Sequence, residues 1–63
     1  MLDTARRYRQ RAEELKIIAE DESSLQTRRT LEQIASDYEL MAETLEAIDR
    51  TNQAIARPRS PSL

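Results

Sequence analysis

"YRQRAEELKII" (residues 8–18) and "YELMAETLEAI" (residues 38–48) are two copies of one pattern, offset by thirty residues. The copies share a tyrosine, an alanine, a leucine and an isoleucine at equivalent places, whereas Arg9 of the first aligns with Glu39 of the second. Apolar residues three and four positions apart lie on one face of an α-helix. We therefore interpret the copies as two helices that pack on each other, with opposite charges favouring that pairing over like with like.

The composition bounds the fold class. The chain has 63 residues with no glycine, cysteine or histidine, and both prolines lie in the last six residues. Alanine, glutamate, arginine, leucine and glutamine, all good helix formers, dominate. The sequence therefore predicts a single all-α domain. A chain this short buries only about 60% of its unfolded surface. Disulfides and the usual soft metal ligands are missing, so oligomerisation is the expected support.

The first helix is predicted over about residues 4–21, with Asp3 or Thr4 as its N-cap. A polar turn over about 21–24 follows, and Ser23 with Gln26 three residues later is typical of a capping box for the next helix, with Asp21 as the alternative cap. The apolar seam of the first helix, a coiled-coil pattern widened by Ile18, consists of Ala5, Tyr8, Ala12, Leu15 and Ala19.

The second helix is predicted over about residues 24–57, where Pro58 stops it. Ala35 and Ala42 are expected to form a thin flank of its seam, and Asn52 interrupts that seam. Residues 58–63 have the composition of a disordered tail. The seam itself follows heptad spacing and consists of Leu31, Ile34, Tyr38, Met41, Leu45, Ile48 and Ile55.

If the chain folds back as a hairpin, the numbers of paired residues should sum to about 46. Tyr8 then lies near Tyr38, and Arg7 lies near Glu39. The second helix is the longer one, at ~50 Å against ~27 Å, so part of its apolar side extends beyond the first helix. We expect a homodimer in an antiparallel four-helix bundle. The predicted packing and dimer interface comprises Tyr8, Leu15, Ile18, Leu31, Ile34, Tyr38, Met41, Leu45, Ile48 and Ile55.

The favoured function is a small, non-enzymatic, self-associating interaction or regulatory protein. Ile17 and Leu40 point away from the seam and are the candidates for a surface that binds a protein partner. The alternative is an RNA- or DNA-binding helical bundle, because a basic cluster around an aromatic residue is typical of nucleic-acid surfaces. Pairing of these arginines with the acidic segment 30–49 is the preferred interpretation. The candidate nucleic-acid contacts are Arg6, Arg7, Arg9, Arg11, Arg28 and Arg29.

Catalysis, cofactors and membranes have no support in the sequence. No histidine or lysine is placed to activate a serine or threonine, and without glycine no phosphate-cradling loop forms. Glu39, Glu43 and Glu46 share a helix face but lack the histidines of di-iron bundles, so we interpret them as a solvated acidic face. We expect no catalytic, cofactor or metal site, no small-molecule substrate and no membrane span, and we expect a cytoplasmic protein.

The pattern resembles a group of short bacterial helical-hairpin proteins of unknown function. These carry a Y-R-x-x-A-x-E-L segment, a polar turn, and an L-x-x-I/L-A-x-x-Y-E-x-x-A segment. The resemblance implies the hairpin fold and adds no site. The residues that carry it are Tyr8, Arg9, Ala12, Glu14 and Leu15, then Leu31, Ile34, Ala35, Tyr38, Glu39 and Ala42.

Overall fold

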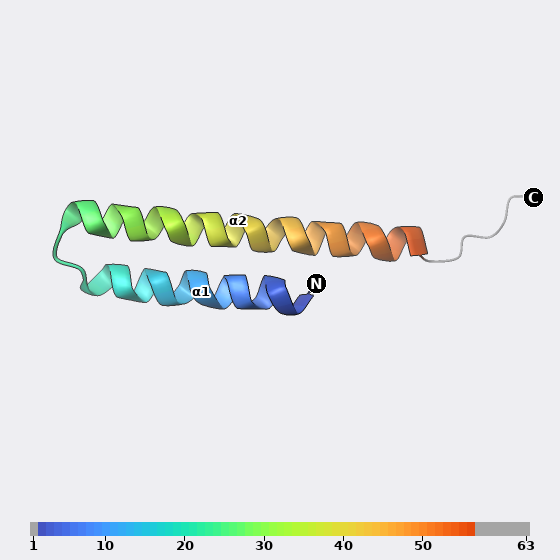
Figure 1. Cartoon of the computed structure of the whole chain (residues 1–63), viewed down its shortest axis with the longest axis horizontal. Helices are drawn as coiled ribbons and strands as arrows, with labels where there is room; N and C mark the ends of the chain where they lie inside the picture. The colour runs from blue at the N-terminus through green and yellow to red at the C-terminus, as the bar shows by residue number, and fades with distance from the viewer. Residues whose placement is uncertain (1, 57–63) are drawn as a thin grey trace, which may run out of the picture.

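The computed structural model describes residues 2–56 and shows two antiparallel helices that form a hairpin (Figure 1). Helix α1 spans Leu2–Asp21 and helix α2 spans Leu25–Ala56, with 20 and 32 residues. The predicted all-α hairpin with a short first helix and a long second one is confirmed, and the described residues contain no strand. The predicted tail, residues 58–63, lies outside the described residues.

Ser24 begins α2. Its hydroxyl accepts the backbone N–H of Thr27 (3.3 Å), and its carbonyl accepts the first helical hydrogen bond, from the N–H of Arg28 (2.9 Å). These two bonds define an N-cap residue. The predicted capping box that starts at Ser23 is therefore wrong by one residue. The N–H of Ser24 donates to the carboxylate of Glu22 (3.0 Å), which holds this serine, and not its neighbour, in the capping position.

Arg28 ties the start of α2 to the end of α1. A terminal nitrogen of its guanidinium donates to the backbone carbonyl of Glu22 (3.0 Å), and the side chain is half-buried. The N–H of Glu22 in turn donates to the carbonyl of Ala19 in the last turn of α1 (3.1 Å). A cation at the C-terminal end of a helix is favoured by the helix dipole. Arg28 therefore stabilises the turn of the hairpin.

Alanines form the centre of the contact between α1 and α2. Ala12, Ala35 and Ala42 are completely buried, and Leu15 is the only larger side chain that is buried among the described residues. The buried alanines repeat every seven residues, so they form one line along each helix: Ala5, Ala12 and Ala19 on α1, and Ala35 and Ala42 on α2. Small side chains at a contact allow helix axes to approach closely. The expectation that Ala35 and Ala42 form only a thin flank is wrong, because close approach pushes the larger side chains to the sides.

Two different faces flank this line of alanines. Residues three after an alanine point to one side of a helix, and residues four after it point to the other side. We call the first side the apolar face. It carries Tyr8, Leu15, Leu31, Tyr38 and Leu45. We call the second side the charged face. It carries Arg9, Lys16, Glu39 and Glu46.

The register predicted for the apolar face is confirmed. The rings of Tyr8 and Tyr38 lie 5.5 Å apart between centroids, at a tilt of 55°. This is a favourable geometry for an aromatic pair. Leu31 packs against the cluster that contains Leu15, as the same register requires. The prediction that Arg7 lies near Glu39 is wrong, since Glu39 on the charged face accepts a hydrogen bond from Lys16 instead.

Candidate functional site

The charged face is held by two cross-helix ion pairs. Arg9 donates to both carboxylate oxygens of Glu46, from Nε at 2.9 Å and from a terminal nitrogen at 2.6 Å. Lys16 Nζ donates to Glu39 and lies 3.8 Å from Glu13 on its own helix. The basic first copy of the repeat therefore does pair with the acidic second copy. The pairs that form were not predicted: Arg9 binds Glu46, seven residues beyond its equivalent Glu39.

These ion pairs shift the pKa values of their members. The hydrogen bond from Arg9 lowers the pKa of Glu46, and the same bond raises the pKa of Arg9. The hydrogen bond to Glu39 raises the pKa of Lys16. All four side chains remain partly open to solvent. Partly exposed pairs add little to stability but disfavour other alignments of the helices. The charged face thus favours the observed register of the hairpin, and its four side chains are paired with one another.

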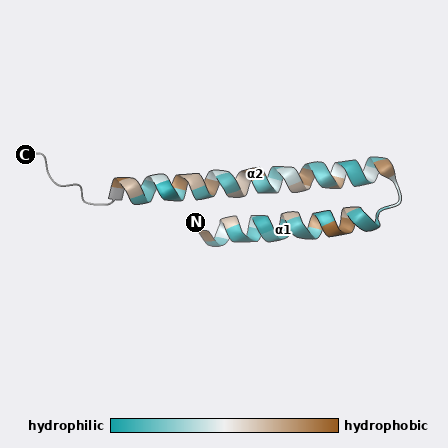
Figure 2. Ribbon diagram, turned by 180° about the vertical axis from the view of Figure 1, so that it is seen from behind, coloured by the Kyte–Doolittle hydropathy of each residue, from teal (hydrophilic) through white to brown (hydrophobic). Residues whose placement is uncertain are grey.

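A line of large apolar side chains on α2 adjoins the apolar face. Ile34, Met41, Ile48 and Ile55 repeat every seven residues. Ile34 and Met41 directly precede the buried Ala35 and Ala42, and Ile48 lies one repeat further along. These side chains therefore point about 100° away from the contact with α1. Their exposed fractions are 39%, 40% and 41%, and that of Ile55 is 76%. We call these four residues the outer stripe. Figure 2 shows apolar colouring at intervals along the whole of α2, whereas on α1 it is strongest near the turn.

The structure separates the ten residues of the predicted packing and dimer interface into three groups. Leu15 is buried in the contact between the helices. Tyr8, Leu31, Tyr38 and Leu45 are half-buried on the apolar face. The exposed group consists of Ile18, Ile34, Met41, Ile48 and Ile55.

Ile17 and Leu40, the predicted partner surface, are exposed by 58% and 63%. Each follows a buried alanine, Ala12 or Ala35, by five residues, which places it about 140° away from the helix contact. The two residues therefore lie on the outer sides of α1 and α2. The hairpin does not bring them onto one surface.

The six candidate nucleic-acid contacts do not form one cluster. Arg9 binds Glu46, and Arg11 lies 3.1 Å from Glu14. Arg28 is committed to the turn. Arg6 and Arg7 are exposed near the start of α1, whereas Arg29 is exposed near the start of α2, at the opposite end of the hairpin (Figure 1).

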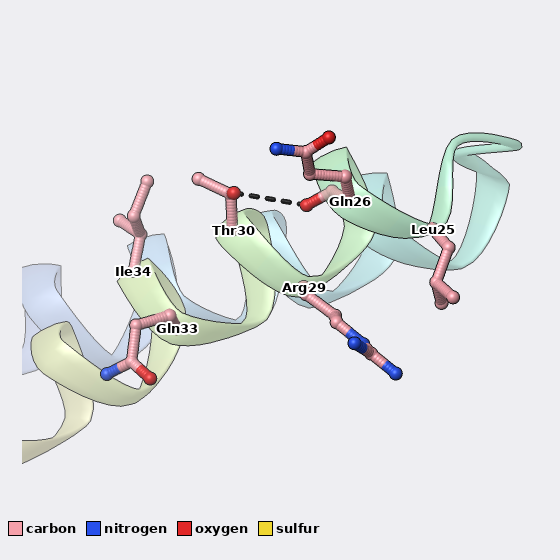
Figure 3. A pocket seen from close by; sticks show the side chains of 6 residues that line it. All are labelled: Leu25, Gln26, Arg29, Thr30, Gln33 and Ile34. Carbon is pink, nitrogen blue, oxygen red and sulfur yellow. Dashed lines mark hydrogen bonds between the residues drawn. The ribbon is translucent and has the colours of Figure 1, made fainter.

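No enclosed binding site is evident in the described part of the chain. A shallow depression near the start of α2 is lined by residues of that one helix, and their side chains fan outward instead of converging (Figure 3). Its lining residues are Leu25, Gln26, Arg29, Thr30, Gln33 and Ile34. A second open depression lies between the helices and is lined by Thr4, Tyr8, Leu40, Met41, Thr44 and Leu45, so it includes one residue of the predicted partner surface. The second is continuous with the apolar face.

Within residues 2–56 no three acidic side chains converge in a way that could hold a metal ion. Neither described helix combines the length and the apolar character needed to cross a membrane. No family model matches the chain, and comparisons with curated proteins and with solved structures give no match.

Proposed function

We propose that this chain is a small, non-enzymatic interaction protein whose hairpins associate with one another through the apolar face and the outer stripe. The assembly is a homodimer with an antiparallel four-helix arrangement. The observation that carries this proposal is the division of apolar residues within the hairpin. Small alanines fill the contact between α1 and α2, whereas Ile34, Met41 and Ile48 stay about 40% exposed and Ile55 is 76% exposed.

A single hairpin leaves the four large apolar side chains of the outer stripe only partly buried. Complete burial of an isoleucine or methionine stabilises a structure by about 1.5–3 kcal/mol relative to leaving it exposed. The alanine contact offers far less area per residue. A continuous exposed apolar surface of this kind is typical of protein interfaces. Association of two copies would bury the outer stripe on both.

A protein partner remains part of the proposal. Ile17 lies on the outer side of α1 and would stay accessible after two hairpins pair through α2. Leu40 borders the depression that Met41 and Leu45 also line, at the edge of the proposed contact. Single exposed apolar residues are common, so these two support a partner surface less strongly than the outer stripe supports self-association.

The competing proposal, an RNA- or DNA-binding bundle, has weaker support. A nucleic-acid surface needs several cations along one face. Here Arg9, Arg11 and Arg28 already bind groups of the same chain. The exposed Arg6 and Arg7 lie at one end of the hairpin, and Arg29 lies at the other. Titration of the protein into a labelled RNA hairpin and a labelled DNA duplex, at low and high salt, separates the two proposals. Tight binding that falls steeply with salt would favour the nucleic-acid function.

A matched pair of charge insertions tests self-association. We expect Ile48→Glu to shift the molar mass measured by light scattering from dimer to monomer, because it buries a carboxylate in an apolar contact. Ala47→Glu introduces the same charge at an exposed residue five positions after the buried Ala42, on the outer side of α2, and should leave the dimer intact. Equal masses for wild type, Ile48→Glu and Ala47→Glu would contradict the proposed interface.

A further inference from the structure

The side of α2 that faces away from α1 is almost free of charge. The outer stripe carries none, and the neighbouring line of Thr30, Asp37, Thr44 and Thr51 carries one, at Asp37. This second line also repeats every seven residues, and we call it the threonine line. On the other side of the outer stripe lie Tyr38 and Leu45 of the apolar face. Three adjacent lines thus form a broad surface with one charged group.

The threonines of this surface are prepared for burial. The hydroxyl of Thr30 donates to the carbonyl of Gln26 (3.1 Å), that of Thr44 to Leu40 (2.9 Å), and that of Thr51 to Ala47 (3.0 Å). Each bond reaches back four residues along α2, so the donor is satisfied inside the helix. A buried hydroxyl costs free energy chiefly when its donor has no partner. These threonines can therefore enter an apolar contact without that penalty.

The equivalent flank of α1 is not prepared in this way. It contains Arg11, which is exposed and lies 3.1 Å from Glu14, between Thr4 and Ile18. Burial of a partly solvated ion pair costs desolvation that the pair does not reliably recover. A partner that covers the apolar side of the hairpin therefore meets less resistance along α2 than along α1.

We infer that the occupant of this surface is α2 of a second copy, running antiparallel, so that Met41 lies opposite the partner's Ile48 and Ile34 lies opposite the partner's Ile55. This inference rests on the proposed self-association and specifies its geometry. A stripe with a seven-residue repeat fits a neighbouring helix that has the same repeat. A second α2 supplies that helix. An uncharged stripe also needs no partner of opposite charge.

Asp37 decides the direction. In a parallel pair the threonine line of one α2 would lie against the apolar face of the other, so the Asp37 carboxylate would be buried beside the partner's Tyr38 without a countercharge, which costs free energy. In the antiparallel pair Asp37 lies beside the partner's Thr51, and the two aspartates are about 20 Å apart along the axis. Pairing through the outer stripe also covers Ile55, which projects beyond α1 and is 76% exposed in the single hairpin.

Single-cysteine variants test this geometry cleanly, since the chain has no cysteine of its own. Met41→Cys and Ile48→Cys are oxidised separately and as an equimolar mixture, and disulfide-linked dimers are counted on a non-reducing gel. A disulfide requires Cα atoms within about 7 Å. We expect disulfide-linked dimers in the mixture and no linked dimers when either variant is oxidised alone. Ala47→Cys, at an exposed residue on the outer side of α2, is the control and should link with neither.

Each outcome separates this inference from the proposed function. If Met41→Cys and Ile48→Cys each link with themselves, the pair is parallel and the inference is overturned. If neither links in any mixture but sedimentation still gives a dimer, the contact lies elsewhere; the inference fails and self-association stands. If both variants and the wild type sediment as monomers, the two proposals fail together. Ile34→Cys with Ile55→Cys repeats the test should either central variant fail to fold.

Discussion

Replacing Ala42 by leucine forces a branched side chain into a completely buried position between α1 and α2. The residue that it replaces has no exposed surface, so the larger group can fit only if the helices move apart or adopt strained rotamers. Overpacking of this kind costs about 1–3 kcal/mol. In a domain this small each kcal/mol lowers the melting temperature by about 4–8 °C. We therefore expect a clear loss of thermal stability in Ala42→Leu.

Ala47→Leu is the matched control for this experiment. Ala47 is exposed and follows Ala42 by five residues on the same helix, so it points about 140° away from the contact with α1. Leucine and alanine have similar helix propensities, and surface substitutions change stability by about 0.5 kcal/mol or less. Both variants should be melted by circular dichroism at one protein concentration, because self-association makes the midpoint concentration-dependent.

A leucine at position 42 that leaves the stability unchanged would contradict the close alanine contact. If Ala42→Leu melts with or above the wild type, the alanines do not form a close contact, and a seam of larger residues holds the hairpin. If Ala47→Leu loses as much stability as Ala42→Leu, the loss comes from leucine in the helix and says nothing about the contact.

Three further predictions follow from single side chains. Leu15→Ala should lower the free energy of unfolding measured in urea titrations by about 2–5 kcal/mol, because loss of this buried side chain leaves a cavity. Ile17→Ala should change the same free energy by about 0.5 kcal/mol or less. Equal effects would show that the wrong face of α1 is assigned to the contact. Ser24→Ala should cost about 0.5–2 kcal/mol by the same measurement as the loss of an N-cap, and a larger loss in Ser23→Ala would restore the other serine as the cap. The hydrogen bond from Arg9 lowers the pKa of Glu46 in the folded state. The stability that this bond adds is therefore present above the ordinary glutamate pKa of 4.5 and is lost as the pH falls through the lower pKa of the folded state. The melting temperatures of wild type and Glu46→Gln should therefore converge in acid, and a gap that stays constant down to pH 2 would contradict this linkage.

The hairpin itself could be predicted because its signals are local. Apolar spacing of three and four residues marks both helices, and the polar run before Leu25 marks the turn. The contact between Tyr8 and Tyr38 followed from the same spacing once the chain was folded back. These features depend on helix periodicity alone, which a sequence displays directly.

The centre of the contact could not be predicted in the same way. Ala35 and Ile34 are adjacent, and either line of residues satisfies the heptad pattern. Which one faces α1 depends on how closely the helices approach, and that distance is a property of the folded pair. The partner of Arg9 was missed for a similar reason. Several glutamates lie within reach of its long side chain, and the choice of Glu46 depends on the offset of the charged face.

The serine cap shows a third kind of limit. Ser23 and Ser24 are equally good N-cap residues by type. The bond from the N–H of Ser24 to Glu22 distinguishes them, and it depends on the path of the turn. The threonine line was not predicted as part of a contact surface, because threonine counts as a polar residue when only the sequence is known. Its hydroxyl is used inside the helix only once the helix has formed.

The most direct test of self-association is the dependence of thermal stability and mass on dilution. The wild-type chain is melted by circular dichroism and sedimented to equilibrium over a hundredfold range of concentration. If two hairpins share their outer stripes, the melting midpoint falls on dilution and the mass moves from dimer towards monomer. A monomeric mass at every concentration, with a melting midpoint that does not change, would contradict self-association.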